Sequence, residues 1–224
     1  MLNENKPSVW NLVLSRDFIG ACLSADEEFL ATGNDLPLRN KVYALLHLKR
    51  YQEAAELCRK IAVISNGETS SEFKFEAIAE WIQGHHEKAL MALKNTDNTK
   101  YTDAAGGVEP LLLMFYFSQF SEDKRIRNDI LNKLKKISKG KQSANWPGPI
   151  AQYLLGEIAE DYLRSKIAVQ NILRQKQTCQ ACFYIAAQNP NRAMDLLQEA
   201  MQQGIIASQK TEYYLAKHII DAGE

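Results

Sequence analysis

The stretch TCQACFYIAAQNPNRAMDLLQEAMQQ, residues Thr178–Gln203, decides the fold of this chain. Small and large side chains alternate along it at helical spacing, at Ala181, Tyr184, Ala193, Leu197 and Ala200. Two antiparallel helices approach closely only where small residues face each other and large ones fill the holes beside them. The spacing therefore predicts a helical hairpin with Ala181 opposite Ala193 and Ala200.

Two earlier windows carry the same pattern. In Leu38–Ile64, the pair Ala44-Leu45 is followed by Tyr51, Ala54, Cys58 and Ile61. The next window places Ala79, Gly84, Ala89 and Leu93 at matching offsets. Ala54 and Ala89 are 35 residues apart, close to the repeat of about 34 residues that is typical of tetratricopeptide units. Both windows predict a helix, a tight turn and a second helix.

The remaining segments predict helices without a clear repeat. Asp103–Lys176 is degenerate, but apolar residues recur in it at helical spacing, as at Ile126, Ile130, Leu134 and Ile137. We read this segment as two further hairpins, with capping helices around Trp10–Leu30 and Lys210–Ile220. The predicted organisation is one domain, 1–224, with capping helices in 1–35, two repeats in 36–100, degenerate hairpins in 101–175, and a repeat and capping helix in 176–224.

The motif positions from Ala181 to Ala200 resemble the tetratricopeptide superfamily. This resemblance implies an all-α fold of helical hairpins stacked into a right-handed superhelix. The tract from Trp146 to Ile158, followed by Cys179–Tyr184, resembles the C-terminal part of NlpI-like bacterial proteins, which are exported lipoprotein adaptors. A longer stretch that includes Lys100–Glu109 resembles small bacterial helical-repeat proteins that act as immunity partners of toxins.

Composition and charge narrow the class of function. Lys plus Arg and Asp plus Glu each total 27, so no overall field favours nucleic acid or an anionic membrane. The N-terminal stretch has no signal-peptide pattern, and the longest apolar run, Pro110–Phe117, is far shorter than a membrane span. We therefore expect a cytoplasmic protein without membrane contact. The four cysteines are expected to be reduced, buried thiols: Cys22, Cys58, Cys179 and Cys182.

Motifs that suggest chemistry each favour a structural interpretation. Cys179-x-x-Cys182 lies inside a predicted helix and lacks a second ligand pair for zinc. His85-His86 is expected at a solvated turn. Gly106-Gly107 lacks the Lys-Ser or Lys-Thr of a phosphate-binding loop and is interpreted as a helix break. The sequence therefore predicts no catalytic residues, no metal site and no cofactor.

The candidate partner-binding residues are acidic and aromatic. Glu72, Glu76 and Glu80 recur every four residues and predict an acidic stripe that, with Glu109, meets a basic partner. Aromatic anchors near loops, and one further acid, complete the set: Tyr101, Asp103 and Trp146. The alternatives are a solvated helix face for the acids and core packing for the aromatics.

The lysine-rich stretch Lys133–Lys141 is expected to be a flexible loop or a solvated helix end. Because no aromatic residues are interleaved with the lysines, nucleic-acid binding is not predicted. The leading hypothesis for function is a protein that binds and neutralises a toxin domain. A cytoplasmic adaptor of the NlpI-like type is the alternative, and self-association is left open.

Overall fold

A computed structural model describes residues 7–121 and 123–223, and every regular element in these ranges is helical. This confirms the predicted all-α class. The α-helices are α1 (Val9–Leu14), α2 (Phe18–Thr32), α3 (Leu36–His47), α4 (Tyr51–Ile64), α5 (Ser71–Ile82), α6 (His86–Asn95), α7 (Val108–Ser118), α8 (Lys124–Ser138), α9 (Gly148–Leu154), α10 (Glu160–Ser165), α11 (Asn171–Gln188), α12 (Ala193–Met201) and α13 (Thr211–Gly223). Short 3₁₀ turns are η1 (Thr96–Asn98), η2 (Lys141–Ala144), η3 (Pro190–Arg192) and η4 (Ile205–Gln209). No helix in the described ranges is long and apolar enough to cross a membrane.

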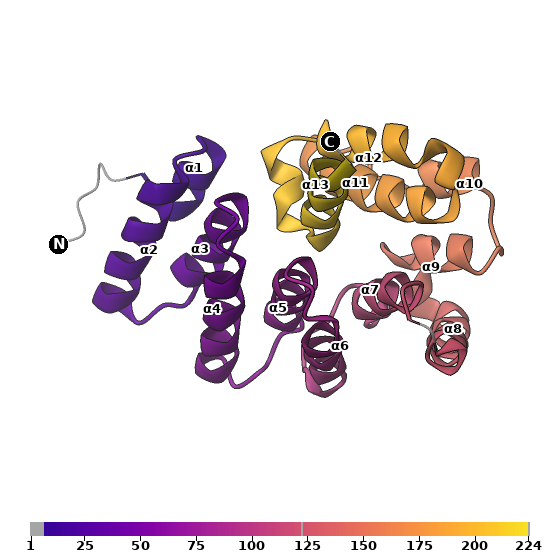
Figure 1. Cartoon of the computed structure of the whole chain (residues 1–224), viewed down its shortest axis with the longest axis horizontal. Coiled ribbons are helices and arrows are strands. Elements are labelled where there is room, and N and C mark those ends of the chain that lie inside the picture. The colour runs from indigo at the N-terminus through magenta and orange to yellow at the C-terminus, as the bar shows by residue number, and fades with distance from the viewer. Residues whose placement is uncertain (1–6, 122, 224) are drawn as a thin grey trace.

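The three predicted hairpins are present as packed helix pairs, α3–α4, α5–α6 and α11–α12 (Figure 1). Small residues at the predicted positions have almost no exposed surface: Ala44, Ala54, Ala79, Ala89, Ala181 and Ala200. Ala193, at the first position of α12, is only half-buried. Because these side chains are small, the helix axes can approach closely, as the alternating pattern predicted. Gly84, with φ +80°, makes the tight turn between α5 and α6.

The N-terminal segment is divided into two helices. Asp17 accepts a hydrogen bond from the backbone N–H of Gly20 and so caps α2, while Arg16 adopts a positive φ at the break after α1. Gly33 ends α2 in the left-handed conformation. The expected capping residues 1–6 lie outside the described ranges.

The middle of the chain departs from regular spacing at one loop. Residues 99–107 join η1 to α7, and α7 packs more loosely against α6 than α5 packs against α4. The stretch Lys133–Lys141 is not a flexible loop, because α8 continues to Ser138 and η2 begins at Lys141. Ile130 and Leu134 of α8 pack into the core, which holds this helix in place.

The helix α13 folds back against the first helices of the hairpins. It contacts α12, α11 and α5, and it lies on the opposite side of α5 from α6 (Figure 1). The Tyr214 ring meets Phe75 of α5 and His47 of α3 edge to face, at centroid separations of 6.3 and 5.4 Å. The chain's own C-terminal helix therefore packs against one face of α5 and reaches α3.

Candidate functional site

The predicted acidic stripe on α5 is an internal ion-pair system. Glu72, Glu76 and Glu80 are all buried. Glu72 pairs with Arg39 of α3, whereas the Nη1 atom of Arg59 on α4 lies 2.9 Å from both Glu76 Oε1 and Glu80 Oε1. The expectation of an open acidic face is wrong, because arginines on the two preceding helices neutralise it.

Glu109 is the centre of a second buried cluster. Its carboxylate pairs with Lys74 of α5, and Lys210 Nζ lies 2.5 Å from its Oε1. Burial raises the pKa of Glu109, but the two ammonium groups lower it by more, so the pKa lies well below its ordinary value. Glu109 is therefore an ionised anchor that joins α5, α7 and the start of α13.

Trp146 and Gln180 continue this cluster. The Nε1–H of Trp146 donates to Gln180 Oε1 at 2.8 Å, and the Gln180 amide donates to Glu109 Oε1 and Glu212 Oε1 at 3.2 and 3.1 Å. Burial, and then the neighbouring Glu109 carboxylate, raise the pKa of Glu212. The indole thus completes a hydrogen-bonded chain that runs through the interior.

Asp103 caps α7. Its carboxylate accepts hydrogen bonds from the backbone N–H groups of Ala105, Gly107 and Glu109, at 2.9, 3.2 and 2.8 Å. Gly107 has φ +94°, which only glycine adopts without strain. The anion-attracting end of α7 is therefore already occupied by the chain's own carboxylate, which agrees with the interpretation of Gly106-Gly107 as a helix break.

Asp103, Glu109 and Trp146 line one hollow of about 690 Å³, here called the central hollow. Other walls come from Tyr43 of α3, Lys176 of α11 and Lys210 beside α13. Burial, and then the charge of Lys210, lower the pKa of Lys176. The structure thus brings three of the candidate residues together, but their polar groups are bonded to neighbouring elements.

Tyr101 lies apart from the central hollow. It forms an isolated bridge with Thr69, and its side chain is 52% exposed with Lys100 Nζ 4.9 Å above the ring. Of the seven candidate residues, Tyr101 alone has a largely exposed side chain. Its role in binding stays a prediction.

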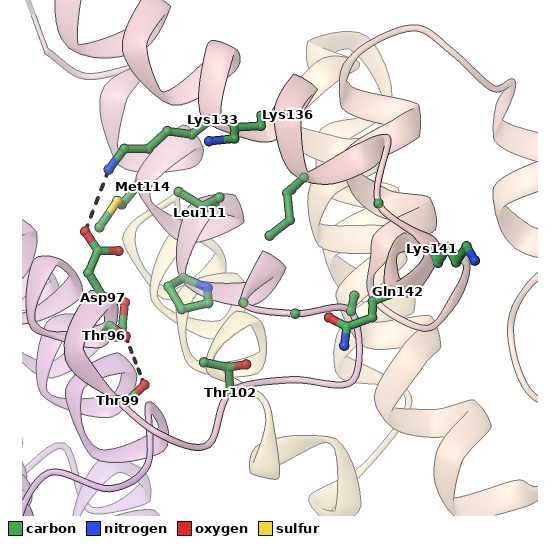
Figure 2. Close-up of a pocket in the computed structure, with 16 residues that line it drawn as sticks. Thr96, Asp97, Thr99, Thr102, Leu111, Met114, Lys133, Lys136, Lys141 and Gln142 are labelled. Atoms are coloured by element: carbon green, nitrogen blue, oxygen red, sulfur yellow. Dashed lines mark hydrogen bonds and ion pairs between the residues drawn. The ribbon is translucent and has the colours of Figure 1, made fainter.

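A different hollow has free charges. It has a volume of about 620 Å³ and lies between the loop 99–107, α7, the end of α8 and η2. Figure 2 shows Leu111 and Met114 of α7 between the lysines of α8 and Thr102 of the loop. Lys133 Nζ lies 3.7 Å from Asp97 Oδ2 (Figure 2). Lys136 and Lys141 have no described carboxylate within ion-pair distance.

A smaller hollow of about 250 Å³ extends this one along α8. It shares Met114 and Lys133 with the larger hollow and is otherwise lined by Leu90, Lys94, Ile126, Asp129 and Ile130. We call the two together the basic groove. This groove was not predicted from the sequence, because the lysines were interpreted as a solvated helix end. The pattern that could have indicated it is the apolar row Ile126, Ile130 and Ile137 on the same helix.

The remaining motifs are structural. All four cysteines are free and buried, as expected, and burial raises the pKa of Cys179 well above its ordinary value. His85 pairs with Glu80 at 2.7 Å, and His86 stacks on Trp81 at a centroid distance of 4.1 Å. Within the described ranges, no group of three or more His, Cys, Asp or Glu side chains is placed to hold a metal ion.

No protein-family model matches the chain, and a search of curated proteins gives no significant match.

Proposed function

We propose that this chain is a tetratricopeptide-like helical-repeat protein that acts by binding another protein. The basic groove carries the proposal. Its floor is apolar at Leu111 and Met114, and its rim has cations without a partner among the described residues at Lys136 and Lys141. Interfaces of proteins combine an apolar centre with charged rims that steer the encounter.

The concrete form that we propose is toxin immunity: in the cytoplasm, the chain binds a toxin domain and blocks its activity, without catalysis. The resemblance of the stretch around Lys100–Glu109 to immunity proteins supports this form. That stretch contributes Thr102 and Gly106 to the wall of the basic groove.

The test is capture of the tagged chain from its native host at low and high salt, with mass spectrometry. We expect one stoichiometric protein whose toxicity in a heterologous host is suppressed by co-expression of this chain. Because the rim is cationic, high salt should weaken the complex. Failure to recover any protein at either salt concentration would contradict the proposal.

An adaptor function is the second candidate, and the tract from Trp146 supports it. This tract resembles NlpI-like proteins, and its Trp146 lines the central hollow. Recovery of a protease or of several envelope enzymes in the same capture would favour the adaptor over the immunity protein.

A further inference from the structure

The wall of the basic groove formed by α8 has the spacing of a helix-docking surface. Ile126, Ile130, Lys133 and Ile137 line the groove at positions i, i+4, i+7 and i+11, so they form one row along the helix. At 1.5 Å per residue, this row is about 16 Å long. A helix of roughly three turns matches its length.

The walls of the basic groove favour a helical over an extended conformation for the segment that binds there. The loop 99–107, η1 and η2 form one part of them. The part that holds the apolar row is formed by α6, α7 and α8, whose backbone N–H and C=O groups are paired within the helices. An extended peptide would bury its own backbone groups there without hydrogen-bond partners, which disfavours its binding. A helix satisfies its backbone internally and presents only side chains to the groove.

The charged residues that line the basic groove indicate which side chains the bound segment carries. Four lysines line the groove (Lys94, Lys133, Lys136 and Lys141) against two carboxylates, Asp97 and Asp129. Asp97 is 3.7 Å from Lys133, so the excess positive charge lies toward Lys136 and Lys141, at the end nearest η2. Acidic side chains at that end of a docked helix would find cations that no described residue neutralises.

We propose that the basic groove binds an amphipathic helix of the partner protein, with an apolar stripe on α7 and α8 and acidic residues at Lys136 and Lys141. This inference rests on the proposed protein-binding function and names the element that is recognised. Helix-in-groove recognition uses such i, i+3, i+4 and i+7 anchors.

The probe is a fluorescein-labelled, hydrocarbon-stapled peptide of about 14 residues, stapled because short helices are marginal in water. It has leucines at i, i+4, i+7 and i+11, with glutamates beside them. A second peptide carries lysine in place of each glutamate. Fluorescence anisotropy with the full chain measures both affinities.

We expect saturable binding of the acidic peptide to the wild type, weakened roughly tenfold or more in the double variant Lys136→Glu/Lys141→Glu. The lysine peptide should bind that variant better than the wild type. The matched control is Lys135→Glu/Lys139→Glu, which makes the same charge change outside the groove and should alter the affinity less than about twofold.

Three results of the binding assay would overturn the inference: no saturable binding of the acidic peptide to the wild type, equal losses in the groove and control variants, or tighter binding of a single-stranded uridine oligomer than of the peptide. The capture experiment separates this failure from that of the proposed function. If the Lys136→Glu/Lys141→Glu variant still captures the partner, the groove is not the binding site, but the proposed protein-binding function holds. Peptide binding by the wild type without any captured partner would keep the groove as a helix-binding site and contradict the proposed protein-binding function.

Discussion

The central hollow, of about 690 Å³, and the larger hollow of the basic groove, of about 620 Å³, are similar in volume but differ in whether their charged groups are paired. Around the central hollow, Glu109 is held between Lys74 and Lys210, and Asp103 is bonded to the backbone of α7. In the basic groove, Lys136 and Lys141 have no described partner. Although the net charge of the whole chain is zero, its charged groups are therefore of two kinds. Some are paired between helices, and others have no described partner.

The largest expected effect is at the centre. Glu109→Ala leaves the half-buried Lys74 and Lys210 without their carboxylate, so the free energy of unfolding should fall by about 3 kcal/mol, the lower end of the range for a broken buried pair. Chemical denaturation at neutral pH measures it. Glu157→Ala, at an exposed site, is the control and should change stability by less than about 0.5 kcal/mol. Equal effects of the two substitutions would show that the central cluster does not stabilise the fold.

Trp146→Phe is expected to have a smaller effect in the same cluster. The substitution keeps most of the apolar ring but removes the Nε1–H donor, so the fully buried Gln180 loses one hydrogen bond. An unsatisfied buried acceptor costs about 1–3 kcal/mol. Thermal unfolding followed by circular dichroism measures the loss. No loss would mean that another donor, such as water, replaces the indole.

His47 predicts that the free energy of unfolding depends on pH. His47 stacks on Phe18 at a centroid distance of 4.5 Å, and burial, with the charges of Arg16 and Lys217, lowers its pKa from 6.5 to about 4. Between these values the unfolded chain binds the proton and the folded chain does not, so stability falls as the pH falls.

We expect His47→Phe to reduce the loss of stability between about pH 7 and pH 5 by about 1–2 kcal/mol. Urea titrations of both proteins at the two pH values measure it. Glu109, with its lowered pKa, contributes stability that is lost only at more acidic pH, below the ordinary glutamate pKa. An identical pH dependence of the two proteins would contradict a buried neutral imidazole.

The smallest effect is expected in the basic groove. Lys136→Glu/Lys141→Glu removes no internal ion pair, so the free energy of unfolding should change by less than about 0.5 kcal/mol. The same denaturation experiment measures it and also confirms that the variant is folded for the peptide assay. A loss as large as that of Glu109→Ala would mean that these lysines are structural.

The sequence predicted the hairpins well because their packing leaves a local trace. Ala181 and Ala200 had to be small for two helices to meet, and small residues at fixed spacing are visible along the chain. The acidic stripe was misinterpreted for the opposite reason. The spacing of Glu72, Glu76 and Glu80 defines one helix face, but only the fold places Arg39 and Arg59 opposite it.

The basic groove was beyond sequence reasoning because it depends on a loop. Residues 99–107 lie between η1 and α7, and several of them line the larger hollow beside α7, α8 and η2. The apolar row from Ile126 to Ile137 was recognised as a helix face, yet its periodicity could not show that part of the face stays uncovered.

The return of α13 has a consequence for how the chain assembles. An open array of hairpins is stabilised by neighbours alone, so it can fold from either end and fray at both. Here Tyr214 approaches the backbone of Tyr43 across 171 residues, and Lys210 reaches Glu109 across 101. During synthesis, the early hairpins leave the ribosome with the surfaces that contact α13 open to water, and these surfaces are covered only after α13 has been made.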